Sequence, residues 1–318
     1  MSNTLPLREL GGSGRRVSCI GLGCMGLAGT WDPSEVGPEH IRRAVAAFTT
    51  AVECGITLFD HADIYGSTAC ESIFRHCLAS APGIRREIFI ATKVGIRRGF
   101  YEHDEGYIRS SIRGSLDRLG IEHADLYQLH RPDPFTHPAE AARAMDALVD
   151  EGLVDLIGIS NYYPEQTRAL QKYLKRPIVS NQIEISLLRL APIYEGAAGG
   201  GGDGVLDQCM GERITPLAYS PVGRGWLTGR RDVPTDHHQA ERIKAVLATA
   251  AELSPKYGGA TPVQLSVAWL LAHPAGIIPL VGSNNPDHIR EAAEGALLEM
   301  TREDWYRLWV AARGNAVP

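Results

Sequence analysis

Lysine is scarce in this chain of 318 residues. Only 5 of its 32 lysine and arginine residues are lysines, and Lys93 is the only one among the first 171 residues. Arginine keeps its proton under almost all conditions. The pKa of a buried lysine, in contrast, responds to neighbouring titratable groups, and the lysine shifts their pKa values in turn. A lysine retained in so arginine-rich a chain therefore indicates a site that needs a compact ammonium group, and Lys93 is our first candidate.

Other absences narrow the class of protein. No apolar run approaches the roughly 18 residues of a membrane span, and the first residues lack the basic and apolar regions of a signal peptide. We therefore predict a cytoplasmic protein with no membrane partner. The net charge is −5 without any basic block, so we expect no nucleic-acid partner. The 6 cysteines form no C-x-x-C pair, so we expect neither a metal site nor a disulfide framework.

Short apolar runs alternate with helix-like stretches along the chain. The runs predict strands at 17–22, 57–60, 88–92, 124–129, 154–159, 178–183, 215–218 and 277–281. Nearly continuous apolar runs are typical of strands buried on both faces of a parallel sheet. Eight β/α units in about 300 residues favour a closed (β/α)8 TIM barrel over an open doubly wound sheet. Because no linker divides the chain, we predict a single domain over residues 1–318.

Three segments outside this alternation carry predictions of their own. Leu7–Leu10 and Arg16–Cys19 predict a small amino-terminal hairpin that plugs the bottom of the barrel. An extra carboxyl-terminal helix is expected over 301–313, with Thr301 and Asp304 as a capping box in which Asp replaces Glu. The glycine-rich stretch 197–204 follows the sixth strand, so we expect it to hang over the mouth of the barrel.

Three of the predicted strands lead into polar groups, namely Asp60, Lys93 and His130, and Tyr65 follows five residues after Asp60. The carboxyl ends of barrel strands share one rim, so we expect these four side chains to meet. A free tyrosine has a pKa near 10; an adjacent ammonium lowers that pKa, and a carboxylate positions the ammonium. With histidine orienting a carbonyl oxygen, the group would protonate an oxygen on which negative charge develops. No activated serine or cysteine nucleophile is evident.

A second constellation lies on the later strands. Amide, hydroxyl and aromatic side chains occur at 158–161, 181–182 and 217–221. Amides suit a carboxamide, and a tyrosine ring can stack on a planar heterocycle. The run 278–283 leads through a small-residue turn into a helix starting near Pro286, a geometry that exposes N–H groups to phosphate.

At these residues the chain resembles an aldo-keto reductase, and most of all a bacterial branch of oxidoreductases within that family. The resemblance runs from about residue 7 to 315, in the expected order. It rests on the segments Phe59–Gly66, Ala91–Lys93, Asp125–His130, Gly158–Asn161, Asn181–Gln182, Leu217–Gly229 and Met300–Trp305.

The resemblance implies reduction of an aldehyde or ketone, with NADPH bound in extended form and without a Rossmann fold. Tyr65 would be the general acid, Asp60 and Lys93 would tune it, and His130 would orient the substrate carbonyl. Hydride would pass from nicotinamide C4 to the carbonyl carbon. Trp31, in the loop after the first strand, would line the substrate pocket with Tyr65 and His130.

The resemblance also implies a cofactor site. The nicotinamide amide would meet Ser160, Asn161 and Gln182, and Tyr219 would stack on the ring. The residues from Ser220 to Leu227 would line the pyrophosphate, and the turn at 282–284 would lie near the adenosine 2′-phosphate and adenine. The complete predicted set is Met25, Asp60, Ser160, Asn161, Gln182, Tyr219, Ser220, Pro221, Gly223, Arg224, Gly225, Leu227, Gly282, Ser283, Asn284, His288 and Glu291.

The chain also departs from the family pattern. His61 stands where many members have threonine, and we assign it no role. Gly282 and His288 stand where many members have a basic residue, and Ala292 where they have asparagine. Histidine is charged only in part near neutral pH, unlike arginine, yet NADPH remains favoured over NADH.

Two other readings stay open at this point. One is a nicotinamide-binding regulatory or sensor subunit with little turnover, since some proteins of this fold serve ion channels. The other is a phosphate-binding barrel isomerase that uses no nicotinamide. The loops that would select a substrate carry no diagnostic residues, and the sequence does not indicate the oligomeric state.

Overall fold

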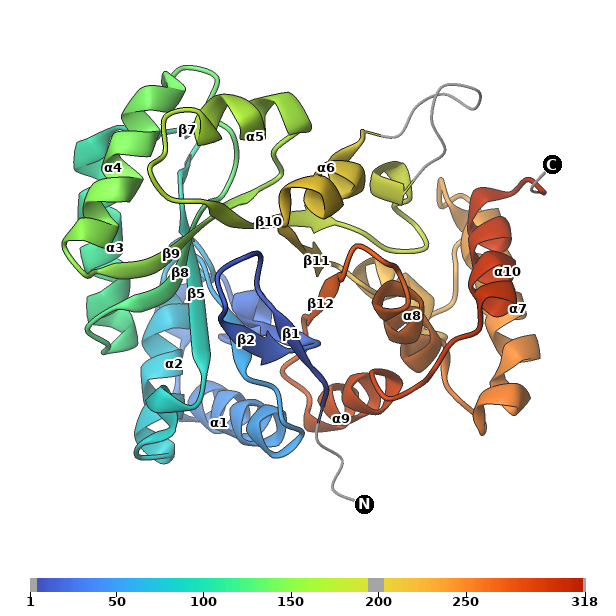
Figure 1. Ribbon diagram of the computed structural model, residues 1–318. Coiled ribbons are helices and arrows are strands. Elements are labelled where there is room, and N and C mark those ends of the chain that lie inside the picture. Colours follow the sequence, from blue (N-terminus) through green and yellow to red (C-terminus); the bar gives the residue numbers. More distant parts are fainter. Residues whose placement is uncertain (1–4, 194–202, 317–318) are drawn as a thin grey trace.

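The computed structural model describes residues 5–193 and 203–316, and within them eight parallel strands form a closed barrel (Figure 1). In order around the wall these are β3 (Gly21–Gly23), β4 (Leu58–Asp60), β5 (Phe89–Val94), β8 (Ala124–Leu129), β9 (Val154–Ser160), β10 (Ile178–Glu184), β11 (Thr215–Tyr219) and β12 (Ile278–Val281). Because β12 pairs in parallel with β3, the wall is complete. The predicted (β/α)8 TIM barrel is confirmed.

At least one helix follows each barrel strand and lies outside the wall (Figure 1). The helices are α1 (Pro38–Glu53), α2 (Ala69–Ser80), α3 (Glu105–Leu119), α4 (Pro138–Asp150), α5 (Pro164–Gln171), α6 (Val205–Glu212), α7 (Ala240–Leu253), α8 (Pro262–Leu271), α9 (Pro286–Gly295) and α10 (Arg302–Arg313). Proline stands at the first position of α1, α4, α5, α8 and α9. Its fixed φ and missing N–H favour that position, so proline marks where these helices begin.

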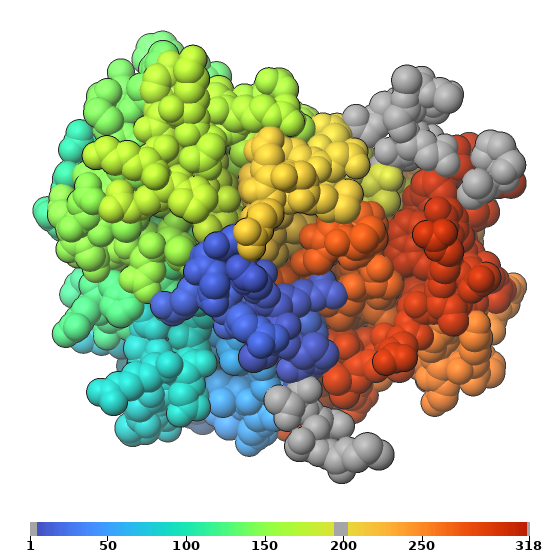
Figure 2. All heavy atoms as spheres, in the orientation of Figure 1, coloured from blue at the N-terminus to red at the C-terminus, as the bar shows by residue number. Residues whose placement is uncertain are grey.

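The amino-terminal hairpin seals one end of the barrel. Strands β1 (Leu7–Glu9) and β2 (Arg16–Ser18) are antiparallel, and in the space-filling view their atoms occupy the middle of this face (Figure 2). Leu10 and Val17 are fully buried against inward-facing barrel residues such as Phe89 and Leu126. Gly11 has φ +57°, and a Cβ there would lie 2.7 Å from the carbonyl oxygen of Val179, so glycine is required for this close approach. The plug is thus as predicted.

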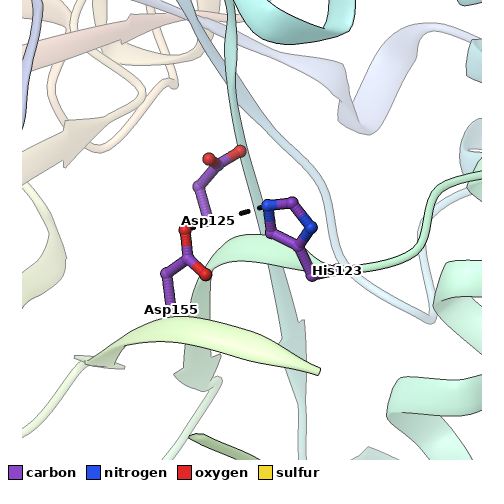
Figure 3. A group of neighbouring side chains, drawn as sticks. All are labelled: His123, Asp125 and Asp155. Atoms are coloured by element: carbon purple, nitrogen blue, oxygen red, sulfur yellow. Dashed lines mark ion pairs between the residues drawn. The ribbon is translucent and has the colours of Figure 1, made fainter. Parts of the chain in front are cut away.

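Charged side chains fasten the hairpin to the barrel at the amino ends of β8 and β9. Asp125 and Asp155 lie beside His123 there (Figure 3). This is the one cluster among the described residues with a spacing that suits a metal ion. Arg15 of the hairpin pairs with Asp125 at 3.0 Å and with Asp155 at 3.5 Å, and Arg85 pairs with Asp125 at 2.9 Å. Two guanidinium groups already neutralise these carboxylates, so the cluster anchors the plug.

The differences from prediction are local. The run 17–22 is not one strand: β2 ends at Ser18, and barrel strand β3 begins only at Gly21. Strand β5 extends to Val94, so Lys93 lies within it. At α10, Thr301 caps the Asp304 N–H as predicted, but the Thr301 N–H donates to the Tyr257 hydroxyl, which replaces the second half of the capping box. Most of the glycine-rich stretch lies outside the described residues.

Candidate active site

A cavity of about 870 Å³ opens at the carboxyl ends of the barrel strands, opposite the hairpin plug. Its size lies within the range of roughly 300–1,000 Å³ typical of pockets for small ligands and cofactors. Side chains from β4, β9, β10, β11 and β12 and from the loops after them form its wall. The cavity therefore lies at the rim of the barrel to which the carboxyl ends of the parallel strands bring their polar side chains.

Asp60, Tyr65, Lys93 and His130 come together at this rim. Lys93 donates three hydrogen bonds, to Asp60 Oδ2 at 2.8 Å, to the backbone oxygen of His61 at 2.7 Å and to the Tyr65 hydroxyl at 3.1 Å. The rings of Tyr65 and His130 meet edge to face, with their centroids 5.8 Å apart. Asp60, Tyr65 and His130 border the cavity, whereas Lys93 lies behind them with no exposed surface.

The local fold explains this convergence. Asp60 pairs in register with Ala91, and Lys93 with Gln128, so β4, β5 and β8 present these side chains at neighbouring heights. Directly after Tyr65 the chain turns through Gly66, which has φ +56°, and enters α2. A Cβ on Gly66 would lie 3.0 Å from the sulfur of Cys70 and 3.1 Å from the backbone oxygen of Thr30, so glycine is needed for the turn.

Burial dominates the acid–base properties of Tyr65. Burial raises the pKa of the Tyr65 phenol above its ordinary value, and the nearby Lys93 ammonium acts in the opposite direction without reversing the shift. From the sequence we expected Lys93 to lower the pKa of Tyr65; its effect has that sign, but the net shift is in the opposite direction. For Lys93, burial alone would lower the pKa, but Asp60 and Tyr65 outweigh it and the net pKa is raised. Thus a protonated phenol faces a firmly held ammonium.

The two neighbouring histidines are neutral for the same reason. Burial, with Lys93 and Arg131 nearby, lowers the pKa of His130 to about 2. Burial and Lys93 lower the pKa of His61 to about 3. His61 packs edge to face on Phe74, with centroids 4.4 Å apart, and neither of its ring nitrogens has a hydrogen-bond partner in the described structure. Of these two histidines, His130 borders the cavity and the fully buried His61 does not.

Three of the four side chains predicted to bind the nicotinamide, Ser160, Asn161 and Tyr219, form one connected network. The Asn161 amide donates to Ser160 Oγ at 2.8 Å, and the Tyr219 hydroxyl donates to Asn161 Oδ1 at 2.9 Å. Gln182 instead donates from Nε2 to Asp60 Oδ1 at 2.8 Å. All four side chains border the cavity. Asn161 has a positive φ of 61°, a conformation that asparagine adopts more readily than most residues.

Most of the predicted cofactor residues border the same cavity, including Met25, Ser220, Pro221, Arg224, Gly225, Gly282, Ser283, His288 and Glu291. Trp31, predicted for the substrate, borders it too and is 58% exposed. Three of the predicted cofactor residues do not line it. Leu227 is fully buried in the core, a Cβ on Gly223 would lie 2.6 Å from Leu188, and the Asn284 amide donates to the backbone oxygen of Gly26 at 3.1 Å.

Three arginines at the cavity were missed by sequence reasoning: Arg131, Arg230 and Arg231. Arg230 forms an ion pair with Glu291, whose other oxygen accepts a hydrogen bond from Thr261 at 2.8 Å. Arg131 follows directly after His130. The sequence therefore contained a signal for Arg131, namely its place next to a predicted site residue. It contained none for the two later arginines, because they follow a glycine and a loop that carry no strand or helix pattern.

Comparison with known proteins identifies the family of this chain. The model of the aldo/keto reductase family matches residues 19–310. The chain belongs to the aldo/keto reductase family. It is 37% identical to a 6-dehydroglucose reductase of Novosphingobium aromaticivorans, over 98% of this chain and 97% of that protein. It is 34% identical to a 6-dehydroglucose reductase of Agrobacterium fabrum, over 91% and 94% of the two chains, and 35% identical to the oxidoreductase YdhF of Escherichia coli, over 87% and 90%.

Solved structures show the same fold. A thermostable aldo-keto reductase, Tm1743, solved with the inhibitor epalrestat, superposes with a TM-score of 0.81 at 25% identity, over 96% of this chain and 100% of that one. A glycerol dehydrogenase of Gluconobacter oxydans superposes with a TM-score of 0.82 at 23% identity, over 100% and 98%, and supports the fold alone.

These findings make the chain an NAD(P)H-dependent oxidoreductase of the aldo/keto reductase family, as predicted. Such enzymes act on small molecules and use a nicotinamide cofactor. In the described ranges, no helix has the length and apolar character needed to cross a membrane.

Proposed function

We propose that this protein reduces an aldehyde or ketone to an alcohol with NADPH, and that Tyr65 is the general acid. The observation that supports this most directly is the chain of contacts from Asp60 through Lys93 to the Tyr65 hydroxyl, which ends at the cavity. We propose that the whole chain forms one functional domain around that cavity.

In this proposal each group has a separate task. NADPH, when bound, supplies hydride to the carbonyl carbon. Neutral His130 donates an N–H to the carbonyl oxygen and so fixes its position. Tyr65 gives its proton to that oxygen as negative charge develops on it, and the buried Lys93 ammonium stabilises the phenolate that remains. Burial of Tyr65 favours this order of events, because it keeps the phenol protonated until the carbonyl oxygen becomes basic.

The cavity residues fit the chemistry of the proposed cofactor. Hydroxyl and amide groups of Ser160, Asn161 and Gln182 suit the carboxamide, and the ring of Tyr219 suits a planar heterocycle. The end of the cavity beside α9 is basic: Arg230 pairs there with Glu291, and His288 Nδ1 lies 3.4 Å from Ser283 Oγ. Arg231 lines the same cavity. We propose that this basic end favours NADPH over NADH through its additional phosphate, since guanidinium groups bind phosphate strongly.

The relatives guide the choice of substrate. Two of them are named 6-dehydroglucose reductase, so a sugar-derived carbonyl compound is the first class to test. Met25 and Trp31 offer exposed apolar surface in the cavity that Tyr65 and His130 also line, and a substrate can pack against it.

The test is NADPH oxidation by the purified protein with a panel of aldehydes, ketones and sugar-derived carbonyls. We expect turnover, and Tyr65→Phe should lower kcat by on the order of a hundredfold or more while NADPH affinity changes little. Near wild-type turnover by Tyr65→Phe would refute the acid role. NADPH binding without oxidation of any compound would favour the regulatory or sensor function, and no binding of NADPH would favour an isomerase.

A further inference from the structure

Two glutamine side chains hold the same oxygen of Asp60. Gln182 on β10 donates from Nε2 to Asp60 Oδ1 at 2.8 Å, and Gln128 on β8 donates to the same atom at 3.3 Å. The other oxygen, Oδ2, accepts from Lys93. An ionised carboxylate only accepts hydrogen bonds, so both amides must present their nitrogen to Asp60, and their orientation is fixed.

The two glutamines differ in what surrounds the amide oxygen Oε1 of each side chain. Gln128 has no exposed surface and does not border the cavity; its Oε1 faces the Ser180 hydroxyl at 3.5 Å. Gln182 borders the cavity, and within the described parts of the chain no hydrogen bond occupies its Oε1. That oxygen is an acceptor with the right chemistry for the N–H groups of a carboxamide.

We propose that Gln182 is a positioning residue that couples occupancy of the nicotinamide site to the Asp60–Lys93–Tyr65 chain, and that Gln128 is its permanent, cofactor-independent counterpart. The proposal rests on the function proposed above. A carboxamide held by Gln182 Oε1 orders the amide and strengthens the hydrogen bond from its nitrogen to Asp60, because hydrogen bonds in a chain polarise one another. The contact of Asp60 with Lys93, and through it with Tyr65, then depends on whether cofactor is bound.

Linkage makes this coupling measurable. If cofactor binding changes the proton affinity of Tyr65, then pH must change cofactor affinity by the reciprocal amount. The groups that face Tyr65 are Lys93 and Asp60, Cys24 from the loop after β3, and His130, which directly follows β8. Groups other than Tyr65 also contribute to the pH dependence of NADPH binding, and the slope that remains in Tyr65→Phe measures their contribution.

The experiment measures the Kd of NADPH by fluorescence from about pH 8 to about pH 11, a range that spans the ordinary pKa of a phenol, near 10, and extends above it because burial raises the pKa of Tyr65. Variants are Gln182→Met and, as the matched control, Gln128→Met; each loses one bond to Asp60. We expect the wild type to show a pH dependence beyond that of Tyr65→Phe. In Gln182→Met, this additional pH dependence of the Kd should fall by at least half. In Gln128→Met it should be unchanged, although kcat should fall on the order of tenfold.

The outcomes separate the two proposals. Retention of the full additional pH dependence by Gln182→Met, or its loss in Gln128→Met as well, would overturn the coupling and leave the proposed function intact. Absence of NADPH binding by the wild type would overturn both. If Gln128→Met does not fold, Gln128→Asn, which is too short to reach Asp60, takes its place with the same expected result.

Discussion

The ammonium of Lys93 lies 2.8 Å from the carboxylate of Asp60, and almost no surface of this ion pair reaches solvent. A buried ion pair contributes modestly to net stability, because removing two charges from water offsets most of their attraction. Loss of one partner is a different matter, because the other charge then remains buried alone. The pair therefore positions Tyr65, and removal of either member should destabilise the fold.

Lys93→Met should consequently destabilise the protein strongly. The Asp60 carboxylate would lose its counter-charge and the Tyr65 hydroxyl its donor, so we expect the free energy of unfolding to fall by about 3–5 kcal/mol. Urea denaturation measures this change. Lys244→Met is the control, since Lys244 pairs with Glu241 on the surface at 3.0 Å and should change stability by less than about 1 kcal/mol. Equal effects of the two substitutions would contradict the account.

The positions of these residues were predictable because the barrel imposes a simple rule. Asp60 and His130 follow or end apolar runs, and parallel strands bring their carboxyl ends to one rim. Gln128 escaped notice because it lies inside the apolar run of β8 and looks like an ordinary core position. Its role depends on side-chain contacts between strands that are far apart in the sequence.

The extent to which each side chain is buried could not be predicted from the sequence either. The direction of the Tyr65 pKa depends on whether desolvation or Lys93 dominates, and desolvation is decided by how helices and loops close over the ring. Arg230 and Arg231 were missed for a related reason. They follow η6 (Gly223–Thr228), where three residues with positive φ turn the chain, so no periodic pattern directs their side chains.

The buried histidines predict a loss of stability in acid. The pKa of His61 in the folded protein is about 3, below its ordinary value of about 6.5, because of burial and Lys93. The unfolded chain therefore binds an additional proton below about pH 6.5, and stability falls by about 1.4 kcal/mol for each further pH unit. His61→Leu should make the decrease in Tm between about pH 6.5 and about pH 5 shallower. An unchanged decrease would contradict the assignment of a neutral His61.

Asp63 should act in the opposite direction. It accepts hydrogen bonds from Ser111 at 2.8 Å and Tyr107 at 3.1 Å, yet burial raises its pKa to about 6. Between its unfolded value near 3.9 and about 6, the folded protein binds more protons than the unfolded chain, so this group stabilises the fold as the pH falls. Asp63→Asn should therefore make the acid-dependent decrease in Tm steeper than in the wild type, as followed by thermal denaturation across the same range.

Arg230 should contribute to the preference for NADPH. Its guanidinium group borders the basic end of the cavity and is held there by Glu291. Charge-assisted hydrogen bonds are worth about 1.5–3 kcal/mol, so Arg230→Ala should weaken NADPH binding about tenfold to a hundredfold and NADH binding less. Kd measurements for both cofactors test this. Arg302, exposed and outside the cavity lining, supplies the control Arg302→Ala; equal weakening for NADPH and NADH would refute a selective role.

Gly158 should be intolerant of any side chain, because it makes room for the network below Asp60. A Cβ there would lie 2.4 Å from Ser180 Oγ and 2.9 Å from Gln128 Cγ. We expect Gly158→Ala to destabilise the protein by about 1–3 kcal/mol through overpacking and to lower kcat by displacing Gln128 from Asp60.

The control is Gly211→Ala on α6, where no atom lies within 4 Å of the added Cβ. That substitution should be neutral or stabilise the helix by up to about 1 kcal/mol. Adding Ser180→Ala to Gly158→Ala removes the closest of the clashing atoms and should restore part of both stability and kcat. If the double variant were no better than Gly158→Ala alone, steric pressure on the Ser180–Gln128 contact would not be the cause.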